Sequence, residues 1–149
     1  MDIRHILAPT DFSDYSKKAL SDALELAQTF GAKLTLLHVV EPAPYLGEFT
    51  PPAAGADLVS DLERQAGAEL ARVLPEAQRA QIEVRRSVVM GSPLRKIIEA
   101  AEAEHVDLIV MATHGRTGLS HLLIGSVAER VVRTAPCPVL TIRPSAEQA

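Results

Sequence analysis

The chain has 149 residues, of which 47% are hydrophobic and 23% charged; these values predict one globular domain over residues 1–149 and exclude wholesale disorder. The formal net charge of −4 disfavours nucleic acid as a main partner, because non-specific binding to DNA depends on basic side chains that neutralise phosphates. A single cysteine excludes an intrachain disulfide framework, and without a signal-peptide-like start or a run of about 20 apolar residues we expect a cytoplasmic protein with no membrane partner.

Two short apolar runs near the start predict the first strands of a sheet. The run over residues 3–8 (IRHILA) is typical of a buried strand that ends at Pro9, and residues 33–40 (KLTLLHVV) predict a second one. Between them, apolar residues recur at helical spacing over residues 19–30, and Gly31 is a natural helix stop. The chain therefore begins with a strand, a helix and a strand.

The middle of the chain changes character at residues 42–56, where four prolines and two glycines fall within 15 residues. This composition predicts a loop. Leucine and alanine at four-residue spacing over residues 58–70 predict a helix that ends before Pro75, and residues 82–90 (IEVRRSVVM) predict a third strand.

The last third of the chain repeats the alternation of helix and strand. A helix is predicted over residues 94–101, and residues 106–112 (VDLIVMA) form the most continuous apolar strand. A glycine-rich turn, THGRTG, follows this strand. A last helix is predicted over residues 127–135, and a last strand over residues 139–142, between two prolines.

The elements alternate as βαβαβαβαβ, which predicts an α/β fold with one open parallel sheet and helices on both faces. In such a sheet, ligands bind beyond the carboxyl ends of the strands, where the strand order reverses. The glycine-rich turn leads to Gly125 and Ser126 at a predicted helix start, where backbone N–H groups suit a phosphate. The same residues also fit a plain turn and a capping box of Ser126 and Glu129, so both interpretations stay open.

At this point the chain resembles a known family. Residues 106–143 (VDLIVMATHGRTGLSHLLIGSVAERVVRTAPCPVLTIR) resemble the carboxyl half of a universal stress protein domain, and ILAPTDFSDYSKKAL, LLHVVEP and VVMGSP match the family in the same order. The nucleotide-binding subgroup of the family carries G-x2-G-x9-G-[ST]. In this sequence the second glycine is Gly115, and Gly125 and Ser126 complete the motif, whereas Ala112 replaces the first glycine.

The resemblance implies a sheet of order 3-2-1-4-5, an adenine nucleotide alpha hydrolase-like fold, and ATP, with or without Mg²⁺, bound across the ends of the first and fourth strands. The family's ligand contacts, carried over position by position, include strand ends, the glycine-rich turn and a helix start. They fall on Pro9, Thr10 and Asp11 for the adenosine side, Val39 for the adenine, Met111 and Ala112 for the floor, and Gly115, Arg116, Gly125, Ser126 and Val127 for the phosphates and ribose.

The resemblance also implies a homodimer joined through the last strand, by Val139, Leu140 and Ile142. The position of that strand gives the same expectation, because an apolar strand at the edge of a sheet is a site for pairing with another chain.

Two residues in the predicted cleft allow more than one role. Asp11 could bond a ribose hydroxyl, help to hold Mg²⁺ through water, or cap the first helix. For His114 we expect a hydrogen-bonding role and not catalysis, because no recognisable motif sets a nucleophile or second carboxylate beside it.

The resemblance implies an ATP-binding regulatory protein of the stress response. From the residues we expect no catalytic residue, no metal-ligating cluster and at most slow ATP hydrolysis. Ala112 favours one alternative, a family member that binds no nucleotide and serves as a dimeric interaction module. A phosphotransfer enzyme is disfavoured, because residues 97–149 contain no lysine that could bind a phosphate.

Overall fold

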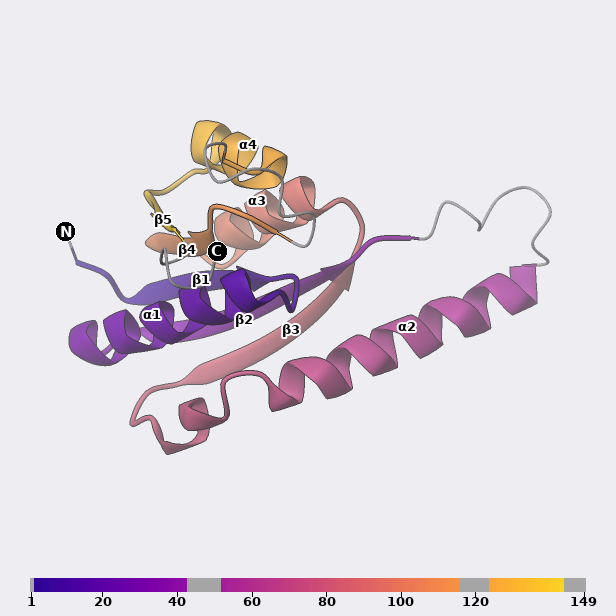
Figure 1. Ribbon diagram of the computed structural model, residues 1–149, viewed down its shortest axis with the longest axis horizontal. Helices are drawn as coiled ribbons and strands as arrows, with labels where there is room; N and C mark the ends of the chain where they lie inside the picture. The colour runs from indigo at the N-terminus through magenta and orange to yellow at the C-terminus, as the bar shows by residue number, and fades with distance from the viewer. Residues whose placement is uncertain (1, 43–51, 116–123, 144–149) are drawn as a thin grey trace.

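The computed structural model describes residues 2–42, 52–115 and 124–143. Within these ranges, five parallel strands form one sheet in the order β3-β2-β1-β4-β5, which confirms the predicted fold class and strand order (Figure 1). The strands are β1 (His5–Thr10), β2 (Lys33–Val40), β3 (Val84–Met90), β4 (Leu108–Ala112) and β5 (Val139–Ile142). The helices are α1 (Asp14–Phe30), α2 (Pro52–Arg72), the short 3-10 helix η1 (Pro75–Arg79), α3 (Pro93–Ala103) and α4 (Ser126–Thr134).

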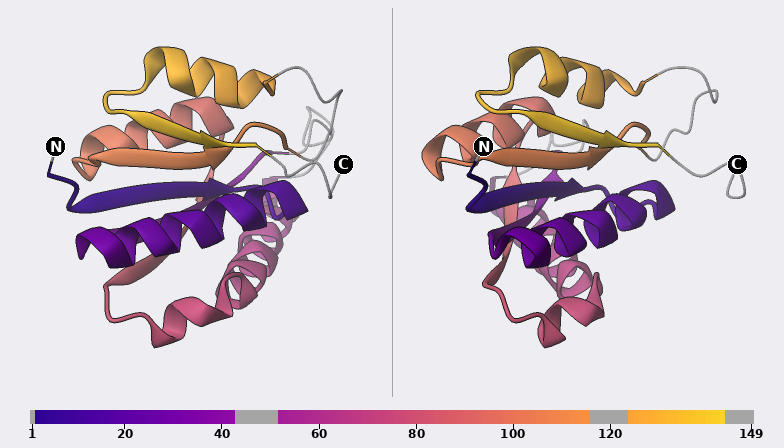
Figure 2. Two further views of the ribbon diagram at one scale, coloured as in Figure 1. Left: turned by 60° about the vertical axis from the view of Figure 1, so that its left-hand side comes forward. Right: turned by 90° about the vertical axis from the view of Figure 1, so that its left-hand side faces the viewer.

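The helices cover both faces of the sheet, with α1 and α2 on one face and α3 and α4 on the other (Figure 2). Side chains of successive strand residues point to opposite faces. Leu36 of β2 therefore packs in the cluster that includes Leu20 of α1 and Leu70 of α2, whereas Leu37 packs with Ile97 of α3. The inner strands β2, β1 and β4 are covered by helices on both faces of the sheet. This explains why they appear in the sequence as continuous apolar runs.

The first strand differs from the prediction of a strand over residues 3–8. The observed strand β1 runs through Pro9, and its pairing with β2 continues as far as Thr10, which lies opposite His38. Ending the strand at Pro9 was wrong because proline removes one N–H donor, and in a parallel ladder that donor serves one neighbouring strand and not both.

The backbone nitrogen of Pro9, which carries no hydrogen, faces β4. The carbonyl of His5 accepts from the N–H of Asp107, and residues two apart in a strand face the same neighbour, so Pro9 faces β4 as His5 does. Pairing between β1 and β4 ends at Leu7 and Ile109. The two central strands are thus joined at their amino ends and are not paired at their carboxyl ends.

The loop predicted over residues 42–56 is wrong for its last part, because α2 begins at Pro52. Proline is tolerated in the first turn of a helix, where its missing N–H has no intrahelical partner, and the alanines that follow favour the helix. Residues 43–51 of the predicted loop lie outside the described residues. Strands β1, β3 and β4 each begin two residues later than predicted, while β2 and β5 have the predicted bounds.

Within the described ranges, every helix is too short or too polar to cross a membrane.

Candidate functional site

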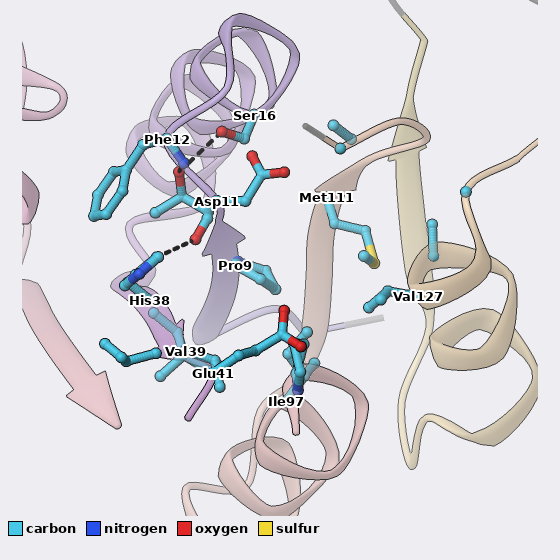
Figure 3. A pocket seen from close by; sticks show the side chains of 18 of the residues that line it. Pro9, Asp11, Phe12, Ser16, His38, Val39, Glu41, Ile97, Met111 and Val127 are labelled. Carbon is cyan, nitrogen blue, oxygen red and sulfur yellow. Dashed lines mark hydrogen bonds between the residues drawn. The ribbon is translucent and has the colours of Figure 1, made fainter. Parts of the chain in front are cut away.

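A cavity of about 740 Å³ lies at the carboxyl edge of the sheet, where the strand order reverses between β1 and β4 (Figure 3). Its size falls in the range of small-molecule sites, about 300–1,000 Å³. Ten of the eleven residues predicted from the sequence line it: Pro9, Thr10, Asp11, Val39, Met111, Ala112, Gly115, Gly125, Ser126 and Val127. The eleventh, Arg116, lies outside the described residues.

Asp11 lies in the turn that joins β1 to α1, and its carboxylate is directed towards the β4 side of the cavity (Figure 3). Its Oδ1 accepts hydrogen bonds from the backbone N–H of Ser13 at 3.0 Å and from the Ser13 hydroxyl at 2.5 Å. The N-cap of α1 is Ser13, whose hydroxyl accepts from the N–H of Ser16. Asp11 is therefore not the residue that caps the helix, and the capping alternative for it is wrong.

Gly115 and Gly125 allow three separate segments to meet at the mouth of the cavity. A Cβ at position 115 would lie 2.7 Å from Asp11 Oδ2, and a Cβ at position 125 would lie 3.1 Å from the carbonyl oxygen of Thr113. The N–H of Gly125 donates to that same oxygen at 2.6 Å. The start of α4, the turn after β4 and the turn after β1 thus lie in close contact.

The capping box considered for Ser126 and Glu129 is absent. Gly125, which has no side chain, is the N-cap of α4, and Ser126 is already the first helical residue. The carboxylate of Glu129 pairs instead with Arg133, one helical turn further on, at 3.0 Å. The start of α4 therefore borders the cavity with backbone and not with a capping side chain, as a helix end that binds a phosphate does.

Ala112, which replaces the first glycine of the family motif, is the last residue of β4 and is buried. It pairs with Ile142 of β5 and is not among the residues with a positive φ, so its backbone conformation does not require glycine. Its place in the cavity lining is on the floor, next to Met111. The substitution adds one methyl group to the cavity lining without distorting the strand.

The histidines near the cavity have structural partners. His38 is buried, its Nδ1 donates to the carbonyl of Thr10 at 2.8 Å, and its ring stacks on Phe12 with 4.1 Å between centroids. His114 Nδ1 lies 2.8 Å from the hydroxyl of Thr113. No group of three metal-ligating side chains occurs in the part of the chain that the structure describes.

The single cysteine, Cys137, lies away from the cavity, just before β5. Burial raises the pKa of its thiol above the usual value. The thiolate, which is the reactive form, is therefore disfavoured at neutral pH.

Some of the cavity wall was not predicted from the sequence. The helix α2 contributes Leu62, Gln65, Ala66 and Glu69, which share one helical face. Glu41, which follows β2, also lines the cavity (Figure 3). Glu41 could have been found, because it follows the carboxyl end of a predicted strand. The residues of α2 carry no such signal, since their spacing is that of any buried helix face.

An open parallel sheet of this order, with a cavity at the switch point and a glycine-lined helix start beside it, defines an adenine nucleotide alpha hydrolase-like protein. The universal stress protein family matches residues 2–143. The chain therefore belongs to the universal stress protein family.

Individual relatives agree with this assignment. The chain is 39% identical over 142 residues to universal stress protein MJ0531 of Methanocaldococcus jannaschii, covering 94% of this chain and 82% of the relative. It is 40% identical over 139 residues to a universal stress protein of Thermus aquaticus, covering 93% and 97% of the two chains. The solved structure of the protein MJ0577 superposes with a TM-score of 0.81 at 30% identity, covering 97% and 99%.

Two further solved structures share the fold at lower identity. A universal stress protein in complex with cAMP has a TM-score of 0.64 at 24% identity, covering 96% of this chain and 98% of that one. A universal stress protein family protein from Arabidopsis thaliana with AMP bound has a TM-score of 0.66 at 20% identity, covering 97% and 94%.

Proposed function

We propose that this protein binds ATP in the cavity at the carboxyl edge of the sheet and acts as a cytoplasmic, homodimeric regulator of the stress response. The observation that carries the proposal is the convergence of Asp11, Gly115 and Gly125 at the mouth of one cavity, at the switch point of the sheet. Family membership supports it, because the sequence keeps the second and third glycines of the subgroup motif.

The phosphates of ATP would lie against the start of α4. The Gly125 N–H is engaged by the carbonyl of Thr113, so the N–H groups of Ser126 and Val127, in the first turn of α4, would face the phosphates. The positive end of the α4 dipole favours a negatively charged group there. The adenosine would extend from there across Pro9 and Met111 towards Val39, which also lines the cavity. This side of the cavity is more apolar, as a site for a base should be.

An adenine nucleotide is the best choice among phosphate-bearing ligands because proteins of this fold are described with cAMP and with AMP. Their sequence identity to this chain is low, so they support only that a protein of this fold can bind an adenine nucleotide, and not which residues make the contacts. The triphosphate follows from the motif that ends in Gly125 and Ser126.

Mg²⁺ would enter with the nucleotide. The described residues contain no three-membered metal cluster, and of the two carboxylates that line the cavity only Asp11 lies towards the proposed phosphates, because Glu41 follows β2 on the adenine side. A magnesium ion commonly binds through one or two carboxylates together with substrate phosphates. The protein side of the site therefore fits a magnesium–nucleotide complex.

Binding, and not turnover, is the proposed activity. His38 and His114 are engaged with backbone and hydroxyl partners, and neither lies in a recognisable nucleophile–base pair. Hydrolysis, if present, would be slow, because phosphoryl transfer needs a positioned nucleophile and stabilisation of charge at the γ-phosphate.

The homodimer would form through β5, which lies at the edge of the sheet with β4 as its neighbour. Leu140 is 39% exposed there, while Val139 and Ile142 are half-buried. A two-fold pair of such strands would cover Leu140 and leave each cavity accessible.

The test is to identify the small molecules released when the purified protein is denatured, followed by calorimetric titration of the emptied protein with ATP in the presence and absence of Mg²⁺. Release of an adenine nucleotide, and binding of added ATP, supports the proposal. A protein that releases nothing and binds no ATP fits the alternative favoured by Ala112, a dimeric interaction module without nucleotide.

A further inference from the structure

The hydroxyl of Ser13 makes two hydrogen bonds of different kinds. As the N-cap of α1 it accepts from the N–H of Ser16 at 3.2 Å, and as a donor it bonds Asp11 Oδ1 at 2.5 Å. The backbone N–H of Ser13 donates to the same carboxylate oxygen at 3.0 Å. One oxygen of Asp11 is thus held by two donors of a single residue, which sets the orientation of the whole carboxylate.

This orientation directs the second oxygen towards the cavity mouth. Asp11 Oδ2 lies so close to Gly115 that a Cβ there would be 2.7 Å away. The carboxylate therefore extends from the turn after β1 to the turn after β4, between the proposed positions of the base and the phosphates.

The backbone around Asp11 is held independently of the Ser13 hydroxyl. Phe12 has a left-handed φ of 65°, and its N–H donates to the hydroxyl of Thr10 at 3.1 Å. The carbonyl of Thr10 accepts from His38, whose ring stacks on Phe12 (Figure 3). These contacts fix the chain on either side. Loss of the Ser13 hydroxyl would leave one of the two bonds to Asp11 Oδ1, from the backbone N–H, and a carboxylate in place of the hydroxyl would push the Asp11 side chain away while the turn stays in place.

We infer that Ser13 is a positioning residue for ribose recognition: by donating to Asp11 Oδ1 it aims the Asp11 carboxylate at a ribose hydroxyl of the bound nucleotide. The inference rests on the proposed function. A carboxylate accepts hydrogen bonds and cannot replace a missing hydroxyl, so an aimed carboxylate selects ribonucleotides over their deoxy analogues. Ser13 thereby serves both the helix and the specificity of the site.

The two roles of Ser13 can be separated by substitution. Ser13→Asp keeps an oxygen that accepts from Ser16, as a good N-cap does, but has no proton to donate and repels the Asp11 carboxylate. Ser13→Thr keeps both the acceptor and the donor and is the matched control. Asp11→Ala removes the carboxylate that Ser13 is inferred to aim.

The experiment measures the dissociation constants of ATP, 2′-deoxyATP and 3′-deoxyATP for the full chain by calorimetry, with the melting temperature of each variant. We expect the wild type and Ser13→Thr to prefer ATP over at least one deoxy analogue by about tenfold or more, as for a hydrogen bond to a charged group. Ser13→Asp should lose this preference, and in the Asp11→Ala background, where the repulsion between the two carboxylates is absent, it should melt like Asp11→Ala alone. In an Asp11→Ala background, Ser13→Asp should have no further effect on binding.

Retention of the ATP preference in Ser13→Asp would overturn the inference, because Ser13 would then act in capping alone. A wild type that binds ATP and both deoxy analogues equally would also overturn it, while leaving the proposed function intact. A wild type that binds none of the three nucleotides contradicts the proposed function itself, and the inference with it.

Discussion

The glycines at positions 115 and 125 show how single residues build the cavity mouth. Both lie where a Cβ would meet atoms of another segment, Asp11 Oδ2 in one case and the Thr113 carbonyl in the other. Neither is among the residues with a positive φ, so their importance comes from close approach and not from an unusual backbone conformation. A larger residue at either position would therefore push apart the segments that meet at the cavity mouth.

Gly125→Val should abolish ATP binding while leaving the protein folded. The Cβ would lie 3.1 Å from the carbonyl oxygen of Thr113, which is backbone and cannot rotate away, so the start of α4 must move away from the turn after β4. Calorimetric titration with ATP measures the loss, and circular dichroism checks the fold. The matched control is Gly67→Val in α2, where nothing lies within 4 Å of the added Cβ. A folded Gly125→Val variant with wild-type affinity would mean that the phosphates bind elsewhere.

Ala112→Gly, which restores the family motif, should change ATP affinity by less than about threefold, or about 0.6 kcal/mol. Ala112 has an ordinary strand conformation, and the close contacts at the cavity mouth involve Gly115 and Gly125. The variant should lose about 0.5–1 kcal/mol of stability, because glycine loses more backbone freedom on folding than alanine does. Titration and urea denaturation measure the two effects. A tightening of ten times or more would show that the Ala112 methyl occupies ligand space.

The part of the candidate site that lies in short sequence motifs could be predicted. The ten predicted residues that line the cavity were carried over from the motifs of the family, and the structure places them near the carboxyl ends of strands, in the turns that follow and at the start of α4. The Ser13–Asp11 contact and the left-handed Phe12 were not predicted, because they depend on how one turn closes in space. Nor could the contribution of α2 be predicted, since it depends on where that helix lies across the sheet.

At the scale of elements, β1 and β4 are tied together at one end and unpaired at the other. The Asp107 carboxylate, just before β4, accepts from the backbone N–H groups of Arg4 and His5 at 2.9 Å each. Pairing then ends at Leu7 and Ile109, and Pro9 offers no N–H to β4. The hydrogen bonds at the amino ends join β1 to β4. The cavity lies at their carboxyl ends, where the two strands are not paired.

The elements themselves were largely predictable because buried strands and amphipathic helices differ in period and length. Two of the errors fell at prolines, whereas the late strand starts did not. The sequence predicts a strand end at Pro9 and a loop at Pro52, yet Pro9 lies inside β1 and Pro52 begins α2. Proline lacks a backbone N–H, and it interrupts a strand or helix only where a neighbouring carbonyl would have accepted a hydrogen bond from that N–H.

Asp107→Ala should reduce the free energy of unfolding by about 1–2 kcal/mol at pH 7, because two backbone donors lose a charged acceptor. The hydrogen bond from Arg4 N–H, more than that from His5, holds the pKa of Asp107 below its usual value. The stabilisation is therefore complete above the ordinary aspartate pKa of about 3.9 and is lost as the pH falls through the lower, folded value.

Urea denaturation at pH 7 and near pH 2 tests this pH dependence, and the gap between wild type and Asp107→Ala should narrow in acid. Asp2→Ala is the control, because Asp2 forms an exposed ion pair with Arg4 and such pairs contribute little. A gap that stays constant between the two pH values would show that the Asp107 charge does not contribute.

For the whole molecule, the two edges of the sheet differ. The edge formed by β3 lies beside α2, and Arg86 of β3 donates to the carbonyls of Leu70 and Val73 near the end of that helix (Figure 1). The other edge, β5, is four residues long and carries the exposed Leu140. An unpaired strand edge with an apolar side chain favours association, so β5 is where a second copy would pair.

Leu140→Lys should convert the proposed homodimer into a folded monomer. The substitution places a charge on the edge strand, where burial against a second copy would desolvate it, and lysine on edge strands is a common barrier to pairing. Light scattering coupled to size-exclusion chromatography measures the mass, and circular dichroism checks the fold. The control is Leu58→Lys, which places the same charge on an exposed leucine of α2, beside the opposite edge of the sheet, and should leave the dimer intact. If the Leu140→Lys variant stays dimeric with an unchanged dissociation constant, the subunits associate through another surface; if the wild type is already monomeric, β5 does not pair in solution.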